Sequence, residues 1–146
     1  MKKWLAKISV CLVALCTFAF GVMAAGCGGK TPKAAQGKVL YADENTVVMT
    51  VLSAEEGATL KDVMTVLKEE GELTFVDDGT GMIVSVNERG VSGNEFWGIY
   101  TSAKDYSNTA WGTTEYDGET LGSAMFGYVA LPALEGEFYV LELTTW

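Results

Sequence analysis

Apolar residues in the middle of the chain recur at the spacing of one helix face. Leu60, Val63, Met64 and Leu67 stand at i, i+3, i+4 and i+7. Thr59 suits the N-cap, with Asp62 three residues later in the manner of a capping box. Gly71 suits the left-handed position after the helix. The pattern predicts a helix over Thr59–Glu70 that buries its four apolar residues.

On both sides of this helix, from residue 46 to the end, the chain is rich in short apolar, β-branched and aromatic runs, which are typical of strands. The expected strands are Thr46–Leu52, Thr74–Val76, Met82–Val86, Phe96–Thr101 and Glu137–Leu143. In the last of these, Tyr139, Leu141 and Leu143 alternate with Phe138, Val140 and Glu142. One helix among several strands predicts an α+β fold, with the helix packed on a mixed β-sheet in a β-grasp-like arrangement.

The first 26 residues have a different pattern. Lys2, Lys3 and Lys7 precede an apolar run over Ile8–Phe20. That run of about 13 residues has the length of a signal-peptide core, whereas a membrane span needs about 20. It ends at Ala24-Ala25-Gly26-Cys27. Residues 1–26 are therefore expected to be a signal peptide, with an uncleaved membrane anchor as the alternative.

The residues before Cys27 resemble the lipobox of bacterial lipoproteins, although Ala24 stands where leucine is commonest. The resemblance implies that fatty-acylated lipid is attached to the Cys27 sulfur and that cleavage leaves Cys27 as the N-terminus. Two or more acyl chains hold a protein firmly on a membrane. The expected location is the outer face of a bacterial cell membrane. An ordinary signal peptide with a chance cysteine is the alternative.

Two further segments follow Cys27. Residues 27–38 are small, basic and without apolar periodicity, so they are expected to form a flexible stalk. Residues 39–146 are expected to form one domain with a modest core.

Composition excludes several kinds of chemistry. The other two cysteines, Cys11 and Cys16, lie within the expected signal peptide, and the chain has no histidine. Ser-His and Cys-His catalysis and cysteine-based zinc sites are therefore excluded in the mature chain. Cleavage leaves seven basic and nineteen acidic residues, a net charge of −12. Such an acidic domain repels nucleic acid. No enzyme, metal site or cofactor is expected.

Four segments together resemble a small extracellular domain family related to the C-terminal domain of transcobalamin and intrinsic factor. These are Gly57–Val63, then Met82–Asn87 with Gly90 and the aromatic Phe96–Tyr100, and finally Glu135–Leu143. The resemblance covers residues 39–146 and implies a β-grasp fold. The chain departs from that family in Ala103–Leu134, which is longer than the usual connection.

Aromatic and short polar side chains are densest over Phe96–Tyr116, and Tyr106–Tyr116 is expected to be largely exposed loop. Rings supply apolar contact area while amides and hydroxyls set orientation, so this region is the candidate recognition surface. Alternation places Trp97 and Tyr100 on opposite strand faces without showing which face is buried. The residues expected to bind a ligand are Trp97, Tyr100, Tyr106, Asn108 and Trp111.

Two kinds of function remain. The first is a membrane-tethered interaction module that presents an aromatic loop to a protein or an envelope partner. The alternative, implied by the transcobalamin resemblance, is a lipoprotein that binds a corrinoid and assists its uptake. Without histidine, the chain cannot ligate cobalt through imidazole.

Overall fold

The computed structural model describes residues 33–146 of the chain. The expected signal peptide, Cys27 and most of the expected stalk lie outside the described residues. Within the described residues, no helix has the length and apolar character needed to cross a membrane.

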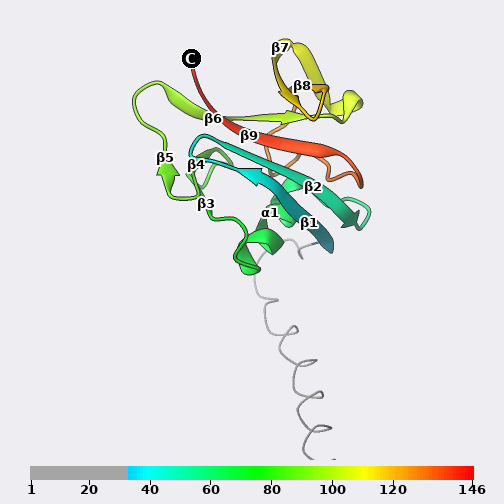
Figure 1. Cartoon of the computed structure of the whole chain (residues 1–146). Helices are drawn as coiled ribbons and strands as arrows, with labels where there is room; N and C mark the ends of the chain where they lie inside the picture. Colours follow the sequence, from blue (N-terminus) through cyan, green and yellow to red (C-terminus); the bar gives the residue numbers. More distant parts are fainter. Residues whose placement is uncertain (1–32) are drawn as a thin grey trace, which may run out of the picture. The chain divides into compact units, whose positions relative to one another are not determined.

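A six-stranded sheet forms the body of the domain (Figure 1). Its strand order is β1-β2-β9-β6-β8-β7. The strands are β1 (Ala35–Ala42), β2 (Thr46–Ala54), β9 (Phe138–Thr145), β6 (Glu95–Thr101), β8 (Glu119–Ala124) and β7 (Ser107–Tyr116). A short 3-10 turn, η1 (Lys104–Tyr106), links β6 to β7.

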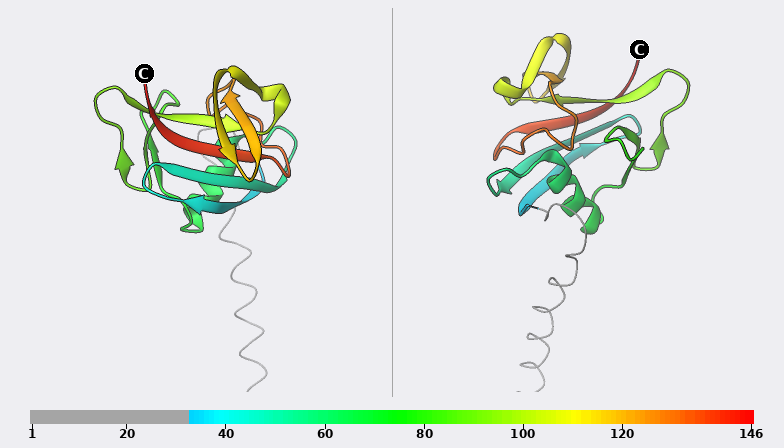
Figure 2. Two further views of the ribbon diagram at one scale, coloured as in Figure 1. Left: turned by 45° about the horizontal axis from the view of Figure 1, so that its top comes forward. Right: turned by 180° about the vertical axis from the view of Figure 1, so that it is seen from behind.

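One α-helix, α1 (Leu60–Glu69), packs on one face of this sheet, as Figure 2 shows from behind. The Asp62 carboxylate accepts hydrogen bonds from the Thr59 N–H (2.8 Å) and the Thr59 hydroxyl (3.1 Å) at its start. At its end Gly71 has a φ of 78°, and the Glu72 N–H donates to the Leu67 carbonyl at 2.9 Å. The predicted helix, with its capping residue and its glycine stop, is confirmed.

The main core lies between α1 and the sheet. Its helix side consists of Leu60, Val63, Met64 and Leu67, all predicted to be buried, and they are. Its sheet side includes Val47, Met49, Tyr139 and Leu141. The predicted alternation in the last strand is confirmed, because Val140 belongs to a separate buried cluster on the other face.

A second, smaller cluster covers the face of the sheet that α1 does not contact, called the outer face below. Val48, Leu121 and Val140 are buried there, with Tyr100, Tyr116 and Phe138 packed around them. The rings of Tyr116 and Phe138 meet edge to face, with centroids 5.3 Å apart. Because Leu121 and Tyr116 come from β8 and β7, the β7–β8 hairpin folds back over the outer face. Figure 2 shows it lying across the sheet.

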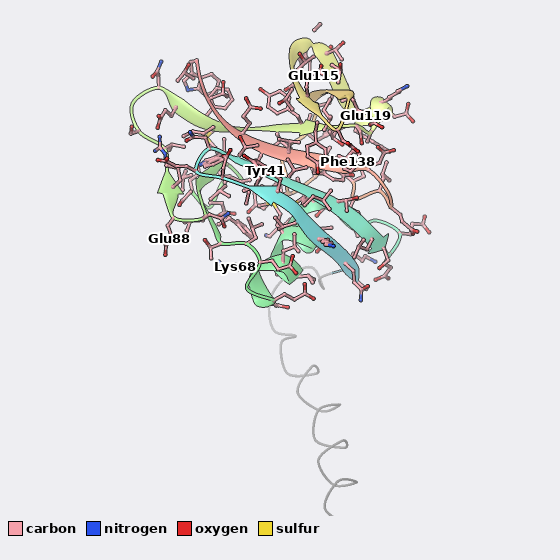
Figure 3. All side chains as sticks on the ribbon, in the orientation of Figure 1. Tyr41, Lys68, Glu88, Glu115, Glu119 and Phe138 are labelled. Carbon is pink, nitrogen blue, oxygen red and sulfur yellow. The ribbon has the colours of Figure 1, made fainter. Side chains whose placement is uncertain are left out.

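A three-stranded sheet stands beside the main one. It consists of β3 (Phe75–Asp77), β4 (Ile83–Val86) and β5 (Arg89–Gly90). Arg89 forms an ion pair with Glu95 at 3.0 Å, which ties the end of this sheet to the start of β6. Side chains of the domain are drawn in Figure 3.

Three expectations are corrected by this fold. The sheet is not mixed, because every strand pair in residues 33–146 is antiparallel. The domain begins earlier than residue 39, because Ala35–Lys38 of the expected stalk pair with β2 as the first half of β1. The stretch after Tyr106 is a strand rather than a loop, and only half of its residues are exposed, the others being partly buried. All five predicted strands are present.

Candidate functional site

The β7–β8 hairpin is closed by a two-residue turn at Asp117-Gly118. Both residues have positive φ, 51° and 77°, and Tyr116 pairs with Glu119 across the turn. Asp-Gly with two positive φ values is the favoured hairpin connection, because its twist matches that of the flanking strands. Local sequence therefore builds the hairpin even though its flanks are polar.

β7 carries a four-residue bulge that presents a tryptophan. Asn108 pairs with Ser123 and Thr113 pairs with Gly122, so Thr109–Gly112 have no partners on β8. The Asn108 side-chain oxygen accepts a hydrogen bond from the Ala110 N–H at 2.9 Å, which starts the turn. Gly112, with a φ of 144°, lets the chain return to the strand. Trp111 projects from this bulge and is 63% exposed.

Gly122 allows the two strands to approach closely at the bulge. A Cβ atom on Gly122 would lie 3.1 Å from the Thr109 nitrogen and 3.2 Å from the Asn108 backbone. These are backbone atoms that cannot move aside cheaply. Glycine at position 122 is therefore a packing requirement of the bulge.

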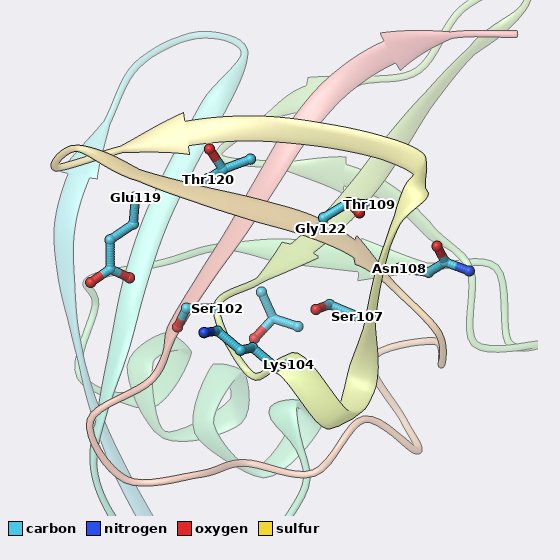
Figure 4. Close-up of a pocket in the computed structure, with 9 residues that line it drawn as sticks. Ser102, Lys104, Ser107, Asn108, Thr109, Glu119, Thr120 and Gly122 are labelled. Carbon is cyan, nitrogen blue, oxygen red and sulfur yellow. The ribbon is translucent and has the colours of Figure 1, made fainter.

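A polar pocket of about 670 Å³ lies between the hairpin and η1 (Figure 4). We call it the hairpin pocket. It is open to solvent on one side, and its wall includes both a lysine and a glutamate. Its lining consists of Thr101, Ser102, Lys104, Ser107, Asn108, Thr109, Glu119, Thr120 and Gly122.

Some of these polar groups already have partners. The Ser102 hydroxyl donates to the Glu137 carboxylate and accepts from the Phe138 N–H at 2.8 Å. The Thr120 hydroxyl donates to the Glu115 carboxylate. The Thr101 hydroxyl is buried and accepts from the Ala103 N–H at 3.1 Å. These residues shape the pocket wall and have less capacity left for a ligand.

Other groups in the pocket are unpartnered within residues 33–146. The hydroxyls of Ser107 and Thr109 form no hydrogen bond to the described part of the protein. Lys104 and Glu119 form no ion pair there; the two ion pairs of that part are Lys33–Glu55 and Arg89–Glu95. The pocket thus offers one cation, one anion and two hydroxyls to a ligand.

The five residues predicted to bind a ligand do not share one surface. Trp97 is 6% exposed, lies in the main core, and donates its indole N–H to the Arg89 carbonyl at 3.2 Å. Tyr100 lies on the outer face, because residues of odd separation along a strand point to opposite sides. Trp97 is therefore a core residue, and its place in the predicted site is wrong.

The other three lie near the hairpin. Tyr106 is half-buried against the main core, with its ring centroid 6.3 Å from that of Phe126. Asn108 lines the hairpin pocket, and Trp111 follows on the bulge. The structure therefore brings together Asn108 and Trp111, with Tyr100 beneath: a Cβ atom on Gly112 would lie 3.6 Å from the Tyr100 ring.

Two features of the structure are not apparent from the sequence pattern. The charged residues Lys104 and Glu119 are 15 positions apart, and only the fold places both at one pocket. Trp146 is 77% exposed and stacks on Phe96, with ring centroids 4.1 Å apart. Phe96 lies four positions before Tyr100 in β6 and therefore on the same strand face, but nothing in the local sequence pattern indicated that Trp146 would pack against it.

No family profile, curated protein or solved structure matches this chain significantly. Within residues 33–146, no three acidic or cysteine side chains are grouped so as to hold a metal ion.

Proposed function

We propose that this protein is a lipid-tethered, extracytoplasmic binding module of the bacterial cell membrane. In this proposal residues 1–26 are a signal peptide, Cys27 carries the lipid, and residues 28–34 form the stalk. The basic start, the apolar run and the small residues before Cys27 support it. The start of β1 at Ala35 leaves a short connection between the lipid and the folded domain.

We further propose that the domain is a variant of the β-grasp fold, distantly related to the C-terminal domain of transcobalamin. A single helix against one face of a sheet supports this. Antiparallel pairing throughout residues 33–146 distinguishes the variant. The segment Ala103–Leu134, which is longer than in that family, contains η1 and the β7–β8 hairpin.

The observation that carries the binding proposal is Trp111, exposed on a bulge beside a polar pocket. Tryptophan combines a large apolar area with few rotatable bonds, and it is enriched among residues that dominate binding energy. The bulge depends on Gly112 and Gly122 and leaves four residues of β7 without partners on β8. A role in recognition would explain why this irregularity is present. The hairpin side is therefore the proposed contact surface for a protein or envelope partner.

The same geometry offers less to a corrinoid. The hairpin pocket is polar and open, and the chain has no histidine to ligate cobalt. Corrinoid binding remains the alternative outcome of the test below. An enzymatic role has no support in the composition, since the mature chain has neither histidine nor a free thiol under the lipidation proposal.

Site-specific photo-crosslinking in intact cells tests the binding proposal. A photoreactive residue at position 111 is expected to capture a partner in the envelope. The same photoreactive residue at position 88, where Glu88 is exposed in the turn between β4 and β5, serves as the control and is expected to capture none. Equal capture at both positions would refute the hairpin as the contact surface.

A titration with cobinamide, followed by tryptophan fluorescence, tests the alternative that the domain binds a corrinoid. Trp111→Ala and Trp146→Ala are a matched pair, since both remove an exposed tryptophan and only the first stands beside the pocket. A saturable signal that disappears in Trp111→Ala and persists in Trp146→Ala would establish corrinoid binding at the hairpin. No saturable signal would leave the partner-binding proposal in place.

A further inference from the structure

Two opposite charges lie on the walls of the hairpin pocket without being paired to each other. Lys104 is the first residue of η1, and Glu119 is the first residue of β8. Figure 4 shows Glu119 extending from the hairpin and Lys104 extending from the turn beneath it. No ion pair within residues 33–146 includes either residue, so neither charge is neutralised by a close partner.

Lys104 is one of three lysines in residues 33–146, with Lys38 and Lys61, that form no ion pair and no side-chain hydrogen bond there, and of these three only Lys104 lines the hairpin pocket. The chain beyond the expected signal peptide has seven basic residues against nineteen acidic ones. Within the described part, Lys33 and Arg89 form ion pairs, and Lys68 donates to the Phe75 carbonyl at 3.2 Å while lying over the Phe75 ring. Lys104 has no such contact and borders a cavity instead. Its ammonium group is available to a carboxylate.

The space near the two charges is suited to hydrogen bonding. The unpartnered hydroxyls of Ser107 and Thr109 line the same pocket. Hydroxyls can both donate and accept, so they suit a ligand with a peptide or carboxyl oxygen and an N–H. The volume of about 670 Å³ lies within the range of small-molecule sites and exceeds what a single amino acid needs.

We propose that the hairpin pocket binds a small zwitterion, a free amino acid or a dipeptide. Its carboxylate would pair with Lys104 and its ammonium group with Glu119. The inference rests on the proposal that the hairpin side is the recognition surface, and it names the ligand class of that surface. A net charge of −12 repels anions at long range, but a zwitterion carries no net charge and is not excluded.

The test uses the full chain, 15N-labelled and purified in detergent micelles, with L-alanyl-L-alanine as the probe. Saturable shifts are expected in the amide signals of Ser107 and Thr109. Two blocked dipeptides remove one charge each: the C-terminal amide lacks the carboxylate, and the N-acetyl form lacks the ammonium group. Each is expected to bind at least about tenfold more weakly, as lost charge-assisted hydrogen bonds require.

Two variants assign each charge to its partner. Lys104→Gln should weaken binding of the dipeptide and abolish its preference over the C-terminal amide. Glu119→Gln should abolish the preference over the N-acetyl form. Lys61→Gln and Glu44→Gln make the same charge changes on exposed residues that do not line the pocket, and they should leave binding unchanged. Both pocket residues are exposed, so all four variants should retain the wild-type melting temperature.

The inference is overturned if L-alanyl-L-alanine gives no saturable shift, or if both blocked forms bind as well as the free dipeptide. It is also overturned if the control variants weaken binding as much as the pocket variants. Persistence of the crosslink from position 111 in any of these cases would leave the proposed function standing. Loss of that crosslink, with dipeptide binding intact, would refute the partner proposal alone.

Discussion

A hydrogen bond between Tyr128 and Asp77 joins the loop before β9 to the small sheet. The Tyr128 hydroxyl donates to the Asp77 carboxylate, and Tyr128 is buried with its ring edge against Phe75. The bond lowers the pKa of Asp77 from its ordinary value of 3.8, with help from the Gly79 N–H. Burial and the neighbouring carboxylate raise the pKa of Tyr128. The pair therefore favours the ionised carboxylate.

The lowered pKa of Asp77 predicts a pH-dependent contribution to stability. Because the carboxylate is favoured in the folded state, its stabilisation is fully present above the unfolded pKa of about 4 and is lost as the pH falls through the lower folded pKa. Tyr128→Phe should lower the melting temperature at neutral pH, and the difference from wild type should narrow below about pH 4. Melting curves across pH measure this.

Tyr116→Phe is the matched control for that series. The Tyr116 ring packs edge to face on Phe138, and its hydroxyl has no hydrogen bond within residues 33–146. The difference in melting temperature between Tyr116→Phe and wild type should stay constant with pH. If the difference for Tyr128→Phe were also constant with pH, Tyr128 would contribute to stability only through packing.

The sequence pattern does not show whether Trp97 or Phe96 lies in the main core. Alternation shows that neighbours in a strand face opposite sides, but both sides of this strand carry rings. The helix covers one face and the hairpin the other, so both faces are partly buried. Which ring lies in the main core depends on where α1 packs, and that contact is not encoded in the strand itself.

At the scale of elements, α1 packs tightly against β1 at Gly37. A Cβ atom on Gly37 would lie 2.5 Å from the Val63 Cγ1 atom and 3.1 Å from the Thr50 carbonyl oxygen. Valine has few alternative rotamers in a helix, so it cannot turn away easily. Gly37→Ala should therefore destabilise the domain by about 1–3 kcal/mol.

Denaturant unfolding of a double variant tests the cause. Val63→Ala removes the clashing methyl group, so the cost of Gly37→Ala should be smaller in that background than in wild type. Additive costs would indicate that the Thr50 carbonyl, rather than the helix, sets the limit at this position.

The helix itself depends on its apolar face. Leu67 is fully buried between the sheet and the turn that follows the helix. Leu67→Ala should cost about 2–5 kcal/mol in the free energy of unfolding, because a cavity remains in the main core. Urea unfolding measures this, with Thr65→Ala on the same helix as a control outside the buried set. A cost below about 0.5 kcal/mol would mean that the core repacks.

Elements with a strong local signature were predicted and elements without one were missed. α1 has a capping residue, a four-residue apolar face and a glycine stop, and each agrees with the others. The β7–β8 hairpin has the Asp117-Gly118 turn as its signal, but half of the residues in its strands are threonine, serine or glutamate. With little apolar alternation, those flanks resemble a loop. The missed hairpin forms most of the candidate site.

At the scale of the whole molecule, strand direction could not be obtained from the pattern. The last strand begins opposite the middle of β2, with Phe138 paired to Thr50, and continues to Glu142 opposite Thr46, so it runs antiparallel to β2. The intervening 83 residues, Glu55–Glu137, return the chain to the middle of β2 rather than to its start. A strand parallel to β2 would instead require the connection to bring the chain back to the start of β2. Neither propensity nor periodicity carries that information.

In the proposed function, the membrane location of the protein depends on Cys27, which lies outside the described residues. Diacylglycerol on its sulfur would add two acyl chains, and about 0.8 kcal/mol per buried CH₂ would make such attachment stable. Cys27→Ala removes the only acceptor left after cleavage of the expected signal peptide. The variant should be released from the membrane fraction or accumulate as the uncleaved precursor. Mass spectrometry of the wild-type N-terminus should show a lipid-modified cysteine.

Cys16→Ala provides the matched control for that experiment, because Cys16 lies inside the expected signal peptide and should leave with it. It should be processed and retained like wild type. If Cys27→Ala were cleaved normally and stayed in the membrane fraction, the attachment would have to come from another part of the chain. Since no helix in residues 33–146 can span a membrane, that outcome would direct attention to the apolar run of Ile8–Phe20 as an uncleaved anchor.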